Sequence, residues 1–235
     1  MDSQAPAETI LEYTFTDGDA SNATNTGTLG ANANGIITGG SIIPSPLSTD
    51  GQGLLLGGAN GNGIGVPNVF DWGGEFTVSL LARLDDPQQN QQSILLDDFG
   101  RPGVLLSVNT GTGQLRFTVV TLDDGVETDV TLLSPDPFPI GEWREVTAVY
   151  DGDAAYLLVD GAVVDSMPAS GPVLSRAGVT PHIGVESDGT VFPWKGAIDD
   201  FRISDMAIAI PEPSSSVLVM VVVSTLVGIG RSRRI

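Results

Sequence analysis

The chain has 235 residues, no cysteine, and 29 acidic residues against 10 basic ones, so its formal net charge is −19. A chain this acidic lacks the basic surface that phosphate backbones require, which excludes nucleic acid as a partner. The lack of cysteine also excludes a disulfide framework and a thiolate metal site. The roughly 210 residues before the C-terminal tail are enough to bury a core in one β-sandwich-sized domain or two small ones.

Short apolar segments between glycine and Asx turns predict strands along the whole body of the chain. Apolar and polar residues alternate with period two, and no convincing helical stretch precedes residue 210. Residues 17–40 and 135–141 are expected to be connections, and turns at 110–113, 123–125 and 160–161 are expected to close hairpins. The predicted strands are 8–15, 51–58, 76–84, 93–97, 103–109, 114–122, 125–133, 144–151, 154–160, 162–167, 182–186 and 196–204. This pattern favours an antiparallel sandwich.

The same alternation predicts the core. Within residues 76–84 every second side chain is apolar and is expected to face inward. Trp143 precedes a strand whose alternating apolar residues run to Tyr150, and it is expected to plug one end of the core. The expected interior residues are Phe76, Val78, Leu80, Ala82, Leu84, Phe117, Leu157 and Phe201.

Several of these segments, taken in order, resemble the laminin-G-like branch of the concanavalin A-like lectin and glucanase superfamily. The segments that carry the resemblance are Tyr13-Thr14-Phe15-Thr16-Asp17-Gly18, Gly53-Leu54-Leu55-Leu56-Gly57-Gly58, Phe76-Thr77-Val78-Ser79, residues 141–161, and Gly196-Ala197-Ile198-Asp199-Asp200-Phe201-Arg202-Ile203-Ser204. The resemblance implies an all-β antiparallel jelly-roll sandwich over residues 8–209. Residues 1–7 are expected to be a disordered N-terminus.

The glucanases of that superfamily carry Glu-x-Asp-x-Glu on one strand, because period two places the three carboxylates on one face. Here Glu127-Thr128-Asp129 lacks the second glutamate, and Glu186-Ser187-Asp188 runs into glycine. The single histidine, His182, has no nucleophile partner in the sequence. The sequence therefore predicts a domain without catalytic residues.

Carbohydrate binding is what the resemblance implies by analogy. A sugar site needs an exposed aromatic plate, and the candidates are Trp72 and Trp194, both in loop-like sequence; the alternative is that they cap the ends of the sandwich. Some relatives bind calcium, and Asp17 and Asp199 are expected to share a Ca²⁺ because their regions are neighbours in those relatives. Alternatively, Asp199 caps a turn or accepts backbone hydrogen bonds.

The C-terminal tail combines an extended segment, an apolar run and a basic end. Residues 217–230 carry no charge and would form a helix of about 21 Å, which only marginally spans a bilayer core of about 30 Å. A basic end stays on the cytoplasmic side of the membrane, which places the body of the chain on the opposite side. The defining residues are Pro211, Glu212 and Pro213 before the run and Arg231, Arg233 and Arg234 after it.

Residues 210–235 resemble the PEP-CTERM sorting signal, which is recognised by the membrane protease-transpeptidase exosortase in bacteria that make extracellular polysaccharide. The resemblance implies export, a transient membrane anchor formed by the C-terminal hydrophobic helix, and cleavage near Pro-Glu-Pro. The alternatives are a plain C-terminal membrane anchor and a buried apolar terminal helix. Met1–Glu8 lack the basic and apolar regions of a secretory signal, so the leader is expected upstream or removed.

Together these patterns predict an exported, non-catalytic protein of the cell surface or extracellular matrix that binds polysaccharide or another surface protein. Two other interpretations remain open at this stage. One is a purely structural matrix component without a ligand site, and the other is an enzyme that cleaves glycans.

Overall fold

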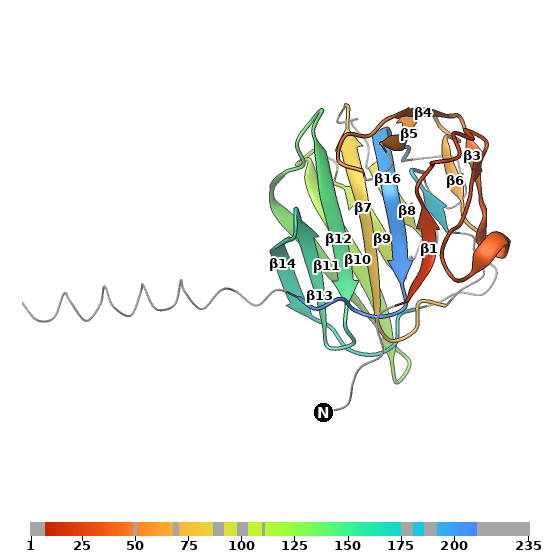
Figure 1. The fold of residues 1–235 in the computed structure, drawn as a ribbon. Helices are drawn as coiled ribbons and strands as arrows, with labels where there is room; N and C mark the ends of the chain where they lie inside the picture. Colours follow the sequence, from red (N-terminus) through yellow and green to blue (C-terminus); the bar gives the residue numbers. More distant parts are fainter. Residues whose placement is uncertain are drawn as a thin grey trace, which may run out of the picture.

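The computed structural model describes residues 8–48, 51–67, 71–86, 92–97, 103–109, 111–174, 181–185 and 192–210. They form two antiparallel β-sheets packed face to face, with one short 3-10 helix, η1 (Gly30–Ala33) (Figure 1). The predicted all-β sandwich is therefore confirmed. The N-terminal residues 1–7 and the tail from 211 onward, with its predicted helix and sorting signal, lie outside the described residues.

The first sheet, called sheet A here, has the strand order β14-β13-β12-β7-β16-β5-β4, and β1 also pairs with β16. Its strands are β1 (Thr9–Tyr13), β4 (Gly40–Pro44), β5 (Gln52–Gly57), β7 (Phe76–Leu84), β12 (Trp143–Tyr150), β13 (Ala154–Val159), β14 (Ala162–Pro168) and β16 (Lys195–Ser204). β16 pairs with β5 through its first half and with β1 through its second half, so β5 and β1 follow one another along the same side of β16.

The second sheet, sheet B, has the order β11-β10-β9-β8-β15-β6-β3-β2. Its strands are β2 (Asn22–Ala23), β3 (Gly35–Thr38), β6 (Gly63–Gly65), β8 (Gln92–Leu96), β9 (Val104–Val108), β10 (Gln114–Asp123), β11 (Val126–Pro137) and β15 (His182–Ile183). The β10–β11 and β13–β14 hairpins use the predicted turns, where Asp124 and Asp160 adopt positive φ.

The core lies between the sheets. The alternation predicted for residues 76–84 is confirmed, because Phe76, Val78, Leu80, Ala82 and Leu84 are all buried. Phe117, Leu157 and Phe201, predicted to line the same interior, are buried as well. Apolar burial of this kind is the main stabilising contribution to a sandwich.

Two predictions about connections and one about the core are wrong. Residues 17–40 were expected to be one long loop, but they contain β2, η1 and β3; these elements are short and glycine-rich, so they lack a clear period-two pattern. β11 continues to Pro137, into the expected connection, as a proline at a strand end can. Trp143 is only half-buried and does not belong to the core cluster.

Candidate functional site

The structure buries both tryptophans proposed as sugar platforms. Trp194 is 0% exposed and packs edge-on against Phe138, with ring centroids 6.4 Å apart. Trp72 is 6% exposed and lies 4.9 Å from Phe76, centroid to centroid. A stacking platform needs a ring face open to solvent, so the expectation of exposed plates at Trp72 and Trp194 is wrong, and both rings instead contribute to the interior.

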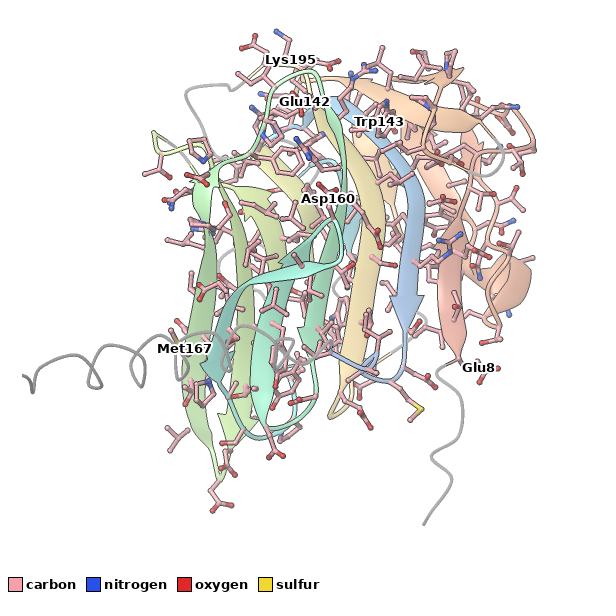
Figure 2. The ribbon with its side chains drawn as sticks, turned by 60° about the vertical axis from the view of Figure 1, so that its left-hand side comes forward. Glu8, Glu142, Trp143, Asp160, Met167 and Lys195 are labelled. Atoms are coloured by element: carbon pink, nitrogen blue, oxygen red, sulfur yellow. The ribbon has the colours of Figure 1, made fainter. Side chains whose placement is uncertain are left out.

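Trp143 is the tryptophan that keeps partial exposure. It pairs with Arg83 across β12 and β7, and the Arg83 guanidinium carbon lies 5.4 Å from the centre of the indole. A Cβ added to Gly53 would lie 3.2 Å from the tip of the indole, atom Cη2, so the ring extends across the outer face of sheet A toward β5. Glu142, Trp143 and Lys195 lie near one end of this sheet, away from Glu8 and Met167 (Figure 2).

The strand pattern contained the signal for this position. Val146, Ala148 and Tyr150 face the core, and a residue an odd number of positions before them must face outward. Trp143 and Glu145 therefore share the outer face of β12. The period-two alternation along this strand would therefore have predicted, from the sequence, that Trp143 faces outward.

A groove of about 220 Å³ lies on the same outer face of sheet A. Cross-strand register places Leu81 of β7 between Glu145 of β12 and Asp199 of β16. Two residues earlier on β7, Ser79 pairs with Arg202 of β16. The groove is lined by Leu47, Ser79, Leu80, Leu81, Glu145, Asp200 and Arg202. Its walls thus combine carboxylates, a guanidinium, a hydroxyl and apolar side chains on neighbouring strands.

A β-bulge in β16 shapes one wall of this groove. The pairing of β16 with β7 slips by one residue between Asp199 and Arg202, and Asp200 has a φ of 46°. The slip occurs where the neighbour on the other side of β16 changes from β5 to β1. Bulges re-aim side chains, and here Asp200 and Arg202 both reach the groove.

Ion pairs hold this wall in place. Nε of Arg202 lies 2.7 Å from Oε1 of Glu12, and its Nη2 lies 3.2 Å from Oδ1 of Asp200. The Thr26 hydroxyl donates to Oε2 of Glu12 at 2.6 Å, which lowers the pKa of Glu12; Arg202 acts in the same direction, against the effect of partial burial. The exposed carboxylate of Glu145, by contrast, has no ion pair or hydrogen bond with the described residues.

The two predicted calcium ligands differ sharply in environment. Asp199 is 0% exposed, and its Oδ1 accepts a hydrogen bond from the Asp200 amide at 2.7 Å. No described group donates a hydrogen bond of good geometry to its Oδ2. Burial raises the pKa of Asp199 to about 6, and the nearby hydroxyls of Ser45 and Ser48 offset part of this rise.

Asp17 is exposed and turns toward its own loop, where it accepts from the Thr24 hydroxyl at 2.6 Å and from the Asp19 amide at 3.0 Å. Within the described part of the chain, no three His, Asp or Glu side chains are arranged to hold a metal ion. Calcium binding by Asp17 and Asp199 stays a prediction.

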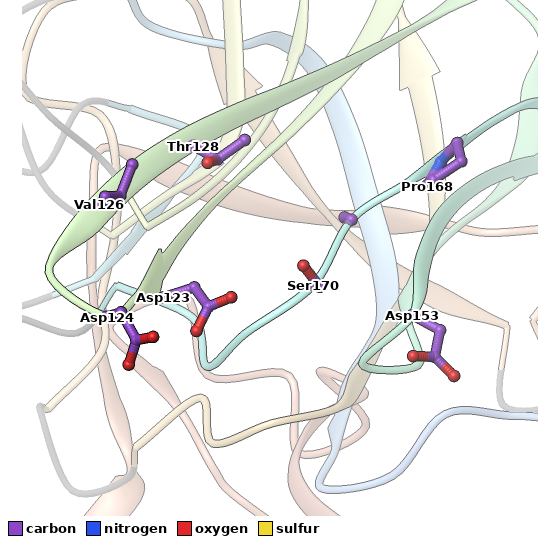
Figure 3. A pocket seen from close by; sticks show the side chains of 8 residues that line it. Asp123, Asp124, Val126, Thr128, Asp153, Pro168 and Ser170 are labelled. Atoms are coloured by element: carbon purple, nitrogen blue, oxygen red, sulfur yellow. The ribbon is translucent and has the colours of Figure 1, made fainter.

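Two further hollows are lined by described residues elsewhere in the fold. One, of about 490 Å³, lies beyond the opposite end of β12, between the β10–β11 hairpin and the chain after β14; it is lined by Asp123, Asp124, Val126, Thr128, Asp153, Pro168, Ala169 and Ser170 (Figure 3). The other, of about 300 Å³, lies between β11 and β13–β14 and is lined by Ser134, Pro135, Asp136, Pro137, Phe138, Pro139, Arg144, Val159 and Val164. The first offers carboxylates and hydroxyls without a basic side chain. The second combines a carboxylate, a guanidinium and a hydroxyl with its apolar lining, but its guanidinium, Arg144, is already paired with Glu142 and Asp160.

Comparison with known families assigns the fold. The family model for the concanavalin A-like lectin/glucanases superfamily matches residues 56–211. No curated protein sequence matches the chain. Among the described residues, no helix has the length and apolar character needed to cross a membrane.

Solved structures share the fold at low sequence identity. Domain 4 of AbnA, an extracellular arabinanase from Geobacillus stearothermophilus in complex with arabinotriose, is 20% identical, with a TM-score of 0.61 over 86% of this chain and 95% of that domain. The binding domain of Paraclostridial Mosquitocidal Protein 1 is 16% identical, with a TM-score of 0.63 over 93% of this chain and 52% of that one. The receptor-binding domain of botulinum neurotoxin D is 14% identical, with a TM-score of 0.58 over 93% and 53%. The chain thus spans about half the length of the toxin domains.

Proposed function

We infer the function of this chain from its family, because the chain belongs to the concanavalin A-like lectin/glucanases superfamily. We propose that it binds carbohydrate without cleaving it, in the groove on the outer face of sheet A. The observation that carries this proposal is the convergence of Glu145, Asp200, Arg202 and Ser79 around Leu81. Sugars need several hydrogen-bonding groups and an apolar contact on a rigid frame, and strands supply that frame.

The size and position of the groove support a glycan chain rather than a compact cofactor. At about 220 Å³ it is smaller than the ~300–1,000 Å³ typical of drug-sized pockets. It opens on the face of the sheet, where a chain can hold one sugar unit in the groove and continue toward Trp143. The similar arabinanase domain with bound arabinotriose shows that this fold accommodates a short glycan in another protein.

The non-catalytic part of the proposal rests on the carboxylates. The Glu-x-Asp-x-Glu triplet of the glucanases is missing from the sequence, and the groove contains two carboxylates, Glu145 and Asp200. One of them, Asp200, is engaged by Arg202 at 3.2 Å. Release of reducing ends from any bound glycan would overturn this part and favour the glycan-cleaving alternative.

A glycan array with the full-length chain tests the binding. We expect at least one class of polysaccharide fragment to bind, and Trp143→Ala to weaken that binding about tenfold, or ~1.4 kcal/mol, by removing the half-buried indole on the same face of sheet A. Ile140→Ala is the matched control, because Ile140 is exposed and lies outside the groove. An array without any bound glycan would leave the purely structural matrix component, or a surface-protein partner, as the better interpretation.

We further propose that residues 210–235 direct export and processing by an exosortase, with deposition at the cell surface or in the extracellular matrix. The order of Pro211-Glu212-Pro213, the apolar run and the arginine end supports this proposal. In a bacterium with an exosortase, replacing all three residues of Pro211-Glu212-Pro213 by alanine should leave the chain uncleaved and membrane-bound. Mass spectrometry of the surface and membrane fractions measures this outcome, with Ser215→Ala as the control. Equal processing of both variants would contradict the proposal.

A further inference from the structure

The positive charges of sheet A are all engaged inside the chain. Its strands contain four described cations, and each has a carboxylate partner: Arg83 with Asp85, Arg144 with Glu142 and Asp160, Lys195 with Asp86, and Arg202 with Glu12 and Asp200. A bound carboxylate would have to compete with these pairs for a cation. The groove therefore offers poor electrostatic complementarity to an acidic sugar.

The negative charge of the groove, in contrast, is not fully compensated. Glu145 and Asp200 line it together with one cation, Arg202, and that cation is also shared with Glu12. The Glu145 carboxylate is exposed and has no partner among the described residues. Among the described residues that line the groove, it is thus the one charge that is available to a ligand.

An aromatic ring that already holds a cation lies beside Glu145. Trp143 and Glu145 alternate on β12 and face outward together, roughly 7 Å apart at about 3.4 Å per residue. The Arg83 guanidinium lies 5.4 Å from the indole centre, within the range of a cation–π interaction. An ammonium group on a sugar would meet the Glu145 carboxylate, while the Arg83 guanidinium already occupies the cation–π position over the Trp143 ring.

We propose that the groove selects glycans with free amino groups, that is, hexosamine units whose nitrogen is not acetylated. The sugar ammonium donates hydrogen bonds to the Glu145 carboxylate, while its hydroxyls bond to Ser79 and to the Asp200–Arg202 pair. This inference rests on the proposed carbohydrate-binding function and names the substrate class of the same groove. Acidic glycans built from uronates are excluded by the same charges.

Titration calorimetry with three probes tests the selection: a glucosamine tetramer, its fully N-acetylated form, and a galacturonate tetramer. At pH 6 and physiological salt, the full-length chain should bind the amino tetramer about tenfold more tightly than the acetylated one and should bind the uronate most weakly. Glu145→Gln should reduce the ratio between the amino and acetylated tetramers to near one. Because the Glu145 side chain is exposed, this variant is expected to fold, and thermal melting checks that.

A matched variant separates a specific contact from general charge attraction. Asp124→Asn removes the same charge from the β10–β11 turn, and asparagine tolerates the positive φ of 47° there. It should leave the affinity ratio unchanged, and an equal drop in both variants would overturn the inference. Equal affinity of the wild-type chain for the amino and acetylated tetramers, or tighter binding of the uronate, would also overturn it while the proposed function stands. If none of the probes binds and the glycan array is silent, it is the proposed function that fails.

Discussion

Replacing Phe76 by alanine is expected to lower the free energy of unfolding by about 3–5 kcal/mol. Phe76 is 1% exposed, and its ring contacts Trp72, Tyr150 of β12 and Phe117 of β10 at centroid distances of 4.9, 6.1 and 6.2 Å. It therefore joins both sheets, and its loss leaves a cavity that the flanking rings cannot fill without moving. Since domains are stable by only about 5–15 kcal/mol, the variant should be close to unfolding.

Chemical denaturation followed by tryptophan fluorescence measures this loss. Phe76→Leu retains most of the apolar volume and should lose clearly less stability than Phe76→Ala. Ile36→Ala is the surface control, because Ile36 is 67% exposed and its truncation should change stability by no more than about 0.5 kcal/mol. A Phe76→Ala variant as stable as Ile36→Ala would show that this aromatic cluster does not hold the sheets together.

Asp199→Asn is expected to stabilise the protein at pH 8 by about 2–3 kcal/mol and to have little effect near pH 3.5. Burial raises the pKa of Asp199 from its ordinary value of 3.8 to about 6 in the folded chain. Between these values the folded state keeps a proton that the unfolded state has lost, so stability falls as the pH rises through this window. Above pH 6 the buried charge imposes its full cost on the free energy of unfolding. At ~1.4 kcal/mol per pKa unit, the upper bound of this cost is about 3 kcal/mol.

Denaturation curves of the wild-type chain and Asp199→Asn at pH 3.5, 6 and 8 measure this dependence. Asparagine keeps the acceptor for the Asp200 amide, which Oδ1 of Asp199 now receives at 2.7 Å, so the change isolates the charge. An equal difference at all three pH values would contradict the assigned pKa shift.

The same variant tests the calcium prediction. If Asp17 and Asp199 share a Ca²⁺, millimolar Ca²⁺ should raise the melting temperature of the wild-type chain at pH 8 and leave that of Asp199→Asn unchanged. If calorimetry detects no heat of Ca²⁺ binding and the melting temperature of the wild-type chain is unchanged, the prediction that Asp17 and Asp199 share a Ca²⁺ is wrong.

Strand patterns in the sequence predicted most of the sandwich but not the position of its tryptophans. β7, β10 and β13 are long or strongly apolar, and their inward residues were identified correctly. Trp72 and Trp194 stand in segments without periodicity, where burial depends on how loops fold back onto the sheets. Trp143 was assigned to the core although the alternation toward Tyr150 places it outside.

The candidate groove could not be predicted from the sequence, for a different reason. Glu145, Ser79 and Arg202 belong to strands far apart in the chain, and their adjacency follows from the order β12-β7-β16 in sheet A. The slip between Asp199 and Arg202 arises where β16 exchanges β5 for β1, and no local residue pattern marks such an exchange. The acidic pair Asp199-Asp200 is visible in the sequence, but the sequence does not show that both are buried and that only Asp200 lines the groove.

By itself, the sequence determined the all-β class, the hairpin turns, the acidic character and the composition of the C-terminal tail, because each depends on residues close together in the chain. The tertiary structure alone decided which tryptophan remains accessible, which carboxylate is buried and which, beside a groove, has no partner among the described residues. These outcomes depend on strand order and cross-strand register, which are set by the packing of distant segments against a shared core.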